Sequence, residues 1–205
     1  MKYFEAQARE AERREFFDTG IRESGLLGRF RDASFETFNA VTTEQRNAAV
    51  ECAAFAGGAT FGRWETLTMI GPPGVGKTHL GAAMVRQTIV GGSRAKYTTC
   101  RDLIRALRAT WRRDSPQSED DVINGFAYTG LLVVDEVGTG MGTEAEVTQL
   151  LDVLDRRYQV GGPTAFATNL QLPELRGVIG DRAFDRLRER SRLVPMNWPS
   201  HRGSA

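Results

Sequence analysis

Residues 71–78 read Gly-Pro-Pro-Gly-Val-Gly-Lys-Thr, a complete match to the phosphate-loop pattern G-x-x-x-x-G-K-[ST]. The glycines let backbone N–H groups turn toward phosphate oxygens, and a helix starting near Lys77 adds the positive end of its dipole. Lys77 is expected to reach the β- and γ-phosphates of ATP, and the Thr78 hydroxyl to hold Mg²⁺. The predicted nucleotide-binding residues are Gly71, Pro72, Pro73, Gly74, Val75, Gly76, Lys77, Thr78 and His79.

Two adjacent acids form the second motif. Residues 131–138 read LLVVDEVG, so a buried strand ends in Asp135 and Glu136. Ligands of parallel α/β sheets bind at the carboxyl ends of the strands. We expect Asp135 to bind Mg²⁺ and Glu136 to act as a general base on water. The bland alternative is a pair of solvated carboxylates. A second acid favours attack by water, and therefore a hydrolase over a small-molecule kinase.

Two further polar residues could complete this site. Asn169 follows the predicted strand 164–168 and could orient the attacking water, although Asn is also common in turns. Arg186 stands between the apolar Phe184 and Leu187, as an anchored residue would. An arginine there could reach a neighbouring subunit's γ-phosphate. The alternative is a solvated basic helix face.

Residues 101–114, RDLIRALRATWRRD, combine arginines with a tryptophan on a predicted basic helix, 101–113. Trp111 continues the apolar helical spacing, so it could belong to the core. It could instead stack on a base of single-stranded DNA, with Arg108, Arg112 and Arg113 on the backbone phosphates. The sequence leaves both interpretations open.

Alternating strands and helices must position these residues. Such repeated units predict an α/β fold with a parallel sheet flanked by helices. Before them, Thr42 and Gln45 form a capping box for a helix that ends near Phe55. The first 17 residues predict a polar helix, followed by a linker at 18–33. The predicted strands are 67–70, 95–99, 131–134, 164–168 and 193–197. The predicted later helices are 77–90, 101–113 and 181–190, and a further helix starts at a capping box of Thr143 and Glu146.

The composition suits one globular domain with an appendage: 205 residues, 40% hydrophobic and 26% charged. No apolar run approaches the roughly 18 residues of a membrane helix, and the charged N-terminus is not a secretory signal. We therefore expect a cytoplasmic protein without membrane contact. The cysteines and histidines, two of each, lack zinc-ligand spacing. The net charge of +1 gives no bulk polyanion signal. Arginine far outnumbers lysine, which reflects either genome composition or phosphate contacts.

Together the motifs resemble an AAA+ ATPase: a glycine loop, a strand with two acids, a polar strand end and an arginine helix. The stretches SFETF, ATNLQLPEL and GDRAFDRLRERSRLVPMNWPSHRGSA are similar to bacterial replicative helicase loaders of the DnaC type. Transposition helper ATPases of the IstB type share this core. The resemblance covers about residues 33–203. It divides the chain into an N-terminal arm and linker, 1–32, and an AAA+ ATPase domain, 33–205.

The resemblance also implies roles. Arg186 matches a trans-acting arginine finger, and Arg202 matches the sensor-2 arginine that contacts the nucleotide in cis. Trp111 falls where the family places an aromatic residue on single-stranded DNA, and Thr143 falls in a DNA-contacting loop. The implied partners are a replicative helicase of the DnaB type, single-stranded DNA and further copies of the chain assembled on either.

Two features depart from the family pattern. Only about 32 residues precede the core, without zinc ligands, so the helicase contact would be reduced to the arm. Little or no C-terminal lid is expected, so a neighbouring molecule would have to cover the nucleotide. The readings that remain open beside a loader-type ATPase are an IstB-type helper acting with a transposase on duplex DNA, and an ATP-gated DNA-binding adaptor with little hydrolysis. A kinase ranks last, because no acceptor pocket is evident.

Overall fold

A five-stranded parallel sheet forms the centre of the protein in a computed structural model, which describes residues 2–59, 61–141 and 143–201. The strand order is β2-β3-β4-β1-β5, and every pairing between neighbouring strands is parallel. This confirms the predicted α/β class. The strands are β1 (Thr66–Ile70), β2 (Ala95–Thr99), β3 (Leu131–Asp135), β4 (Thr164–Thr168) and β5 (Ser191–Pro195).

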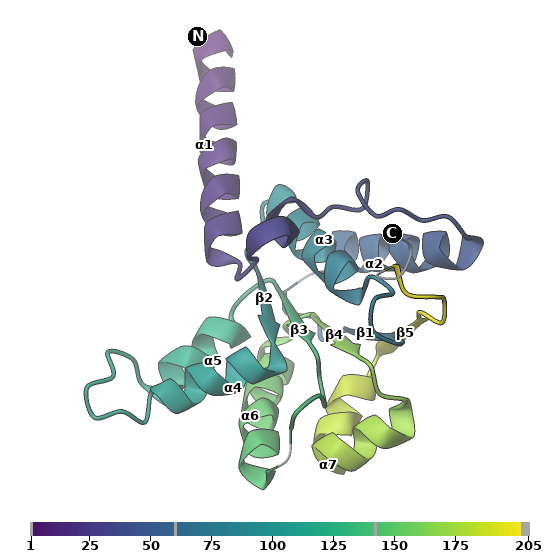
Figure 1. The fold of residues 1–205 in the computed structure, drawn as a ribbon. Helices are drawn as coiled ribbons and strands as arrows, with labels where there is room; N and C mark the ends of the chain where they lie inside the picture. Colours follow the sequence, from purple (N-terminus) through teal and green to yellow (C-terminus); the bar gives the residue numbers. More distant parts are fainter. Residues whose placement is uncertain (1, 60, 142, 202–205) are drawn as a thin grey trace.

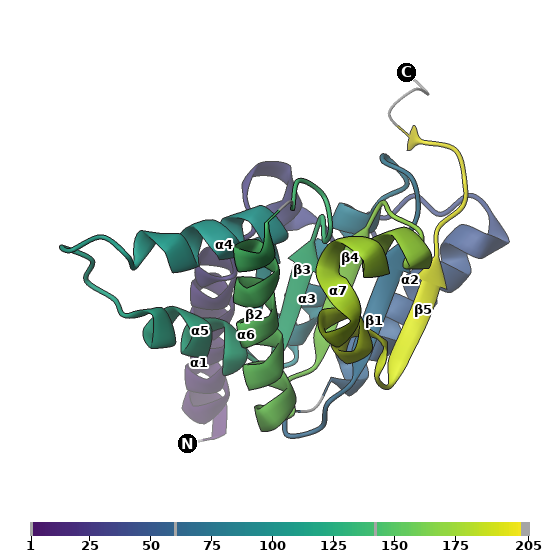
Figure 2. The ribbon, with the colours of Figure 1, turned by 90° about the horizontal axis from the view of Figure 1, so that it is seen from below.

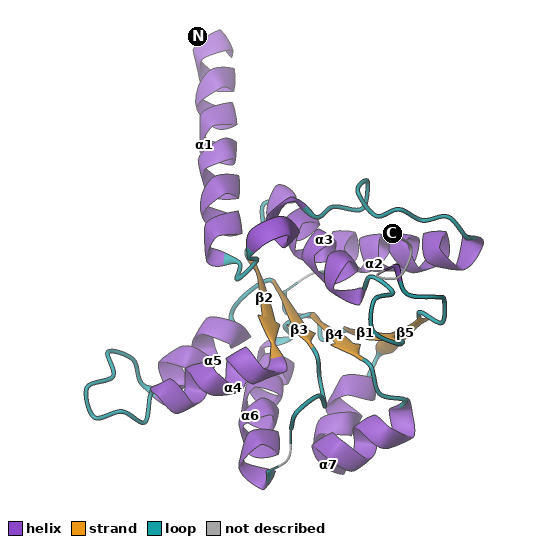
Figure 3. Ribbon diagram, in the orientation of Figure 1, coloured by secondary structure: helices purple, strands orange, loops and turns teal. Residues whose placement is uncertain are grey.

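Helices cover both faces of the sheet (Figures 1 and 2). One face carries α2 and α3, and the other carries α4 to α7. Figure 3 shows the three-layer arrangement by element type, with the long α1 standing away from the layers. The helices are α1 (Lys2–Glu23), the short 3₁₀ helix η1 (Gly28–Asp32), α2 (Thr43–Gly58), α3 (Lys77–Val90), α4 (Cys100–Ala109), α5 (Glu119–Ala127), α6 (Glu144–Val160) and α7 (Leu172–Arg188).

The central strands are apolar on both sides because each side meets a separate core. Leu131 and Val133 of β3 pack with the side chains of α2 and α3. Leu132 and Val134 pack with those of α4 to α7. All four are completely buried. This explains why residues 131–134 show no polar alternation, as expected for a strand inside a parallel sheet.

The N-terminal helix is longer than the sequence suggested. α1 continues through Gly20 to Glu23, so the prediction of a linker from residue 18 was wrong for residues 18–23. Residues 4–16 are exposed, whereas Phe17 and Ile21 pack against the core beside α3. Leu26 is buried in that core. The chain between α1 and α2 therefore lies against the α/β core.

Further element boundaries differ from the predictions, and one helix was not predicted. α4 ends at Ala109 instead of residue 113, and the chain then turns. α5 was not predicted; it is short, and a capping box between Ser118 and Asp121 starts it. α7 begins at Leu172, nine residues before the predicted start at 181, because Gln171 and Glu174 cap it and a kink at Gly180 joins two helical pieces. The last strand is 191–195 instead of 193–197.

Other predictions hold. α3 and the strands β2 and β4 have the predicted bounds. The capping boxes of Thr42 with Gln45 and of Thr143 with Glu146 are both formed. Across the described ranges, no helix has the length and apolar character needed to span a bilayer.

Candidate functional site

The glycine loop connects β1 to α3, in the strand–loop–helix context that phosphate binding requires. Gly76 caps α3 with φ near 100°, which an L-residue with a side chain rarely adopts. A Cβ there would also lie 2.6 Å from the ring of Phe38. The loop therefore needs glycine at this position, and α3 directs its N-terminus toward the loop.

Lys77 is the first residue of α3 and is buried. Its Nζ donates to the carbonyl oxygens of Gly71 at 2.6 Å and Pro72 at 2.8 Å. The ammonium group thus lies along the glycine loop, within reach of whatever the loop encloses.

Asp135 is the centre of a hydrogen-bond cluster at the end of β3. Its Oδ2 accepts from the hydroxyls of Thr78 at 2.8 Å and Tyr97 at 2.5 Å. Its Oδ1 accepts from the backbone N–H of Glu136 at 2.7 Å. The two residues predicted to bind metal, Thr78 and Asp135, are therefore in direct contact, and oxygen ligands of this kind suit Mg²⁺.

Tyr97 was not predicted as a site residue. Burial, and then the charge of Asp135, raises the pKa of its phenol, so the hydroxyl stays protonated and donates. No sequence motif marks it: Tyr97 is one aromatic residue within a strand, and only the pairing of β2 with β3 brings it beside Asp135.

Glu136 is exposed and has φ near 58°, one of two non-glycine residues with positive φ among those described. Its two neighbours in the chain, Asp135 and Val137, are both buried. The left-handed turn lets a carboxylate project into solvent directly after a buried strand. Non-glycine residues in this conformation are uncommon and concentrate at functional sites.

Asn169 directly follows β4 and is half-buried. The Thr168 hydroxyl before it donates to the carbonyl of Val137 at 2.8 Å, and the N–H of Val137 donates to Ala167 at 2.9 Å. These bonds tie the turn after β3 to the turn after β4. Glu136 and Asn169 consequently line the same cavity.

That cavity measures about 470 Å³ and lies at the carboxyl edge of the sheet. It confirms none of the individual roles, but it gathers most of the predicted nucleotide residues in one place. Three lining residues were missed by the sequence analysis: Arg29 and Phe30 from η1, and His201. The full lining is Arg29, Phe30, Pro73, Gly74, Gly76, Lys77, Thr78, His79, Asp135, Glu136, Asn169 and His201.

Two distant segments brace the glycine loop. On one side, His79 contacts the Ser34 carbonyl at 2.8 Å and the Thr37 hydroxyl at 3.2 Å through Nε2. On the other, the Trp198 indole donates to the Val75 carbonyl at 3.0 Å, and the N–H of His201 donates to Gly74 at 3.1 Å. These contacts come from the SFETF stretch and from residues 198–201, so both segments hold the glycine loop in place.

Arg186 does not line the cavity of its own chain. Its Nε donates to Asp155 at 2.9 Å, its Nη1 lies 3.5 Å from Glu189, and its guanidinium carbon is 4.0 Å from the ring centre of Tyr158. Asp155 also binds Arg182 at 2.6 Å. Arg186 is therefore held on the α6–α7 surface. Arg202, the predicted cis arginine, lies outside the described residues.

Three of the predicted DNA residues, Trp111, Arg112 and Arg113, lie in the turn after α4. Trp111 is 62% exposed in the turn after α4, so the core interpretation of Trp111 was wrong. Its Nε1 donates to Glu119 at 3.2 Å. Arg112 and Arg113 are exposed beside it. Figure 1 shows this turn, between α4 and α5, projecting from the body of the protein.

The other two predicted DNA residues, Arg108 and Thr143, both contact Glu146 of α6. The Thr143 hydroxyl accepts from the backbone N–H of Glu146 at 3.3 Å, which is the capping role expected for it. Arg108 donates to Oε1 of the same Glu146 at 3.1 Å. Both residues are exposed, and both are engaged within the chain.

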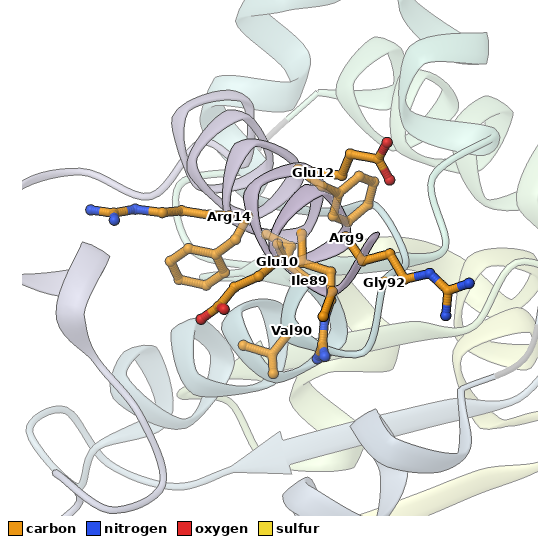
Figure 4. A pocket seen from close by; sticks show the side chains of 11 residues that line it. Arg9, Glu10, Glu12, Arg14, Ile89, Val90 and Gly92 are labelled. Carbon is orange, nitrogen blue, oxygen red and sulfur yellow. The ribbon is translucent and has the colours of Figure 1, made fainter. Parts of the chain in front are cut away.

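A second cavity, about 980 Å³, lies outside the nucleotide site between α1 and the end of α3. Figure 4 shows Arg9, Glu10 and Arg14 of α1 on its wall together with Ile89 and Val90. Its wall therefore combines charged side chains of the arm with apolar residues of the core.

The parallel sheet, the glycine loop after β1 and the acids after β3 define a P-loop domain of the AAA+ class. The chain belongs to the IstB-like ATP binding protein family, whose model matches residues 17–204. It is 30% identical to the replicative helicase loader DnaC of Escherichia coli K12 over 181 residues, 87% of this chain and 73% of that protein. It is 29% identical to the E. coli K12 protein YdaV, over 89% of this chain and 73% of that protein.

Solved structures agree on the fold. A crystal structure of the DnaC helicase loader superposes with a TM-score of 0.75 at 21% identity, over 83% of this chain and 99% of that chain. A structure of the replication initiator DnaA bound to AMPPCP and single-stranded DNA superposes with a TM-score of 0.67 at 20% identity, over 82% of this chain and 50% of that chain. The solved structures show the shared fold, and the family match together with the 30% identity to DnaC confirms the resemblance to helicase loaders and to the IstB-like family.

Proposed function

We propose that this protein binds and hydrolyses ATP and uses the nucleotide to control its grip on single-stranded DNA while a replicative helicase is deposited. The observation that carries the proposal is the meeting of Lys77, Thr78, Asp135, Glu136 and Asn169 around one cavity. These are the residue types that phosphate binding and attack by water require.

In the proposed reaction, backbone N–H groups of residues 71–76 and the N-terminus of α3 bind the phosphates. Lys77 exchanges its loop carbonyls for the β- and γ-phosphates, because an ammonium ion is stabilised more by phosphate oxygens than by neutral carbonyls. Thr78 and Asp135 would hold Mg²⁺, which would neutralise charge on the phosphates. Glu136 takes a proton from the water that attacks the γ-phosphorus, and Asn169 orients that water. The bond between the γ-phosphorus and the bridging oxygen breaks, so that ADP and phosphate leave.

We further propose that Arg186 acts on the nucleotide of a neighbouring copy. Two observations support this: Arg186 does not line the cavity of its own chain, and it lies on the α6–α7 surface. The contacts with Asp155 and Tyr158 hold the guanidinium in one orientation. Arg202 is proposed as the cis arginine on the basis of the family resemblance alone.

The proposed DNA contact is the projecting turn with Trp111, Arg112 and Arg113. An exposed indole flanked by two guanidiniums suits a stacked base and its backbone phosphates. Residues 1–32 are proposed as the helicase-docking arm and 33–205 as the ATPase domain. The exposed length of α1 and the cavity that its residues 6–17 line against the end of α3 support a docking role for the arm. The cytoplasmic location stays a prediction.

The family match favours one second candidate, a transposition helper of the IstB type. Both candidates share the nucleotide chemistry and differ in the nucleic acid and the partner. The test measures ATP turnover and DNA affinity with a single-stranded oligonucleotide and with the duplex of the same sequence, each with ATP and with ADP. ATP-dependent preference for the single strand supports the loader function, and preference for the duplex supports the helper. DNA binding that ATP controls without turnover would instead identify an adaptor.

A further inference from the structure

Tyr97 reaches the nucleotide site from the edge of the sheet. It lies on β2, the edge strand, and its hydroxyl donates to Oδ2 of Asp135. The ring lies beneath α3 where that helix carries Gly81. A Cβ on Gly81 would be 3.5 Å from the Tyr97 ring and 3.1 Å from Val133. A small residue in α3 thus leaves room for the ring.

The hydrogen bond from Tyr97 helps to fix the carboxylate of Asp135, which is one of the two residues proposed to bind Mg²⁺. The present inference rests on that proposal. The Thr78 hydroxyl now donates to Oδ2 of Asp135. A hydroxyl that binds a metal through an oxygen lone pair keeps its proton, so Thr78 can donate to Asp135 and bind the metal at the same time. Tyr97 is the second donor to Oδ2 and comes from a strand outside the glycine loop, while the Glu136 N–H fixes Oδ1.

The main chain of Tyr97 is held by the segment at the base of α1. Its N–H donates to the carbonyl of Ser24 at 2.7 Å. Gly25 has φ near 83°, and a Cβ there would lie 2.2 Å from the carbonyl oxygen of Tyr97. The chain therefore crosses the open edge of β2 in contact with both polar groups of this one residue, and Leu26 is buried directly afterwards.

We propose that Tyr97 is a positioning residue for Asp135, and that Ser24 and Gly25 set its place, so that the base of α1 is coupled to the metal-binding carboxylate. Figure 1 shows α1 meeting the rest of the protein beside β2. A partner that pulls on α1 would act first on the strand that carries Tyr97. Metal affinity is the property that such a movement changes.

The first experiment replaces Tyr97 by Phe, which removes the hydroxyl and keeps the ring. Binding of a fluorescent ATP analogue is titrated with Mg²⁺, and Mn²⁺ binding is followed by electron paramagnetic resonance. We expect the half-saturating metal concentration to rise about fivefold, the factor for one ordinary hydrogen bond, while analogue binding in EDTA is unchanged. Tyr128→Phe is the matched control, since Tyr128 is 60% exposed and lies before β3, at the end of that strand opposite to Asp135. An unchanged metal titration for Tyr97→Phe overturns the inference.

Asp135→Asn in the same titration separates the two proposals. If Asp135→Asn leaves metal dependence unchanged, the proposed metal site is wrong. If Asp135→Asn weakens metal binding but Tyr97→Phe does not, the metal site stands and only the positioning role is wrong.

The second experiment tests the coupling with Gly25→Ala, alone and combined with Tyr97→Phe. A side chain at residue 25 displaces the segment from Tyr97. Gly25→Ala should therefore lower metal affinity in the protein that retains Tyr97. In the Tyr97→Phe protein, which lacks the hydroxyl, it should change metal affinity little. An equal fold-change in both backgrounds, or none in either, overturns the coupling. If Gly25→Ala does not fold, Leu26→Ala takes its place, because it loosens the buried residue directly after Gly25 without placing a side chain against the Tyr97 carbonyl.

Discussion

The indole N–H of Trp198 donates to the carbonyl oxygen of Val75, 3.0 Å away. This bond joins the chain after β5 to the middle of the glycine loop. Replacing Trp198 by Phe removes the donor and leaves the Val75 carbonyl without that bond. We expect about 1–3 kcal/mol of lost stability and weaker ATP binding, because an unsatisfied buried acceptor is costly and the loop loses its brace.

Trp64→Phe is the control for Trp198→Phe. Both indoles are 7% exposed, but within the described part of the chain the Trp64 Nε1 has no hydrogen-bond partner. The same substitution at Trp64 should therefore cost less in the melting temperature and leave ATP affinity unchanged. Equal losses at both positions would contradict the bracing role of Trp198.

Lys77→Ala should weaken ATP binding by at least about tenfold, because a charge-assisted bond to phosphate contributes roughly 1.5–3 kcal/mol. Titration with a fluorescent ATP analogue measures it. Lys96→Ala is the control: Lys96 stands over the ring of Phe126 at 5.3 Å, away from the cavity lining. Unchanged affinity in Lys77→Ala protein would refute the assignment of the phosphate site.

Glu136→Gln should bind ATP normally and lose turnover by about 10² or more, because the amide keeps the size of the side chain but cannot accept the proton. Steady-state phosphate release and analogue binding are measured on the same preparation. The exposed Glu44→Gln, at the start of α2, controls for loss of one surface charge. Turnover near that of the unmodified protein would make Glu136 a strand-end carboxylate only.

Arg186→Ala should lower turnover by about 10³ if the guanidinium acts as a trans finger. Mixing Arg186→Ala protein with Glu136→Gln protein should restore part of it, since one interface in the mixture combines an intact Glu136 with an intact Arg186. Rescue is measured as phosphate release across mixing ratios.

Asp155→Asn provides the comparison for a structural role, because it breaks the ion pair but keeps the arginine. Should Arg186→Ala and Asp155→Asn lose equal stability and activity, and should mixing restore nothing under conditions of assembly, Arg186 would act within its own chain.

Trp111→Ala should reduce affinity for single-stranded DNA by about tenfold or more, since a stacked base contributes roughly 1–3 kcal/mol. Its melting temperature should hardly change, because a side chain that is 62% exposed contributes little to the core. Arg112→Ala and Arg113→Ala should weaken binding less and flatten its salt dependence. Intact DNA affinity in the Trp111→Ala protein would place the DNA contact elsewhere.

The nucleotide site was predictable from sequence because its chemistry is local. A glycine loop needs its residues in consecutive order, so Gly71 to Thr78 identify it without any tertiary information. Asp135 and Glu136 end an apolar run whose burial on both faces shows in its composition. The α/β class followed from the alternation of strands and helices, since periodicity is also a short-range property.

Contacts between distant segments were not predictable in this way. Tyr97 meets Asp135 only because β2 pairs with β3, and Arg29 reaches the cavity only because η1 packs against α3. Whether Trp111 was buried depended on where α4 ended, a boundary that helical spacing could not locate. Sequence periodicity reports which face of an element is apolar, whereas the partner of that face is decided by packing between segments far apart in the chain.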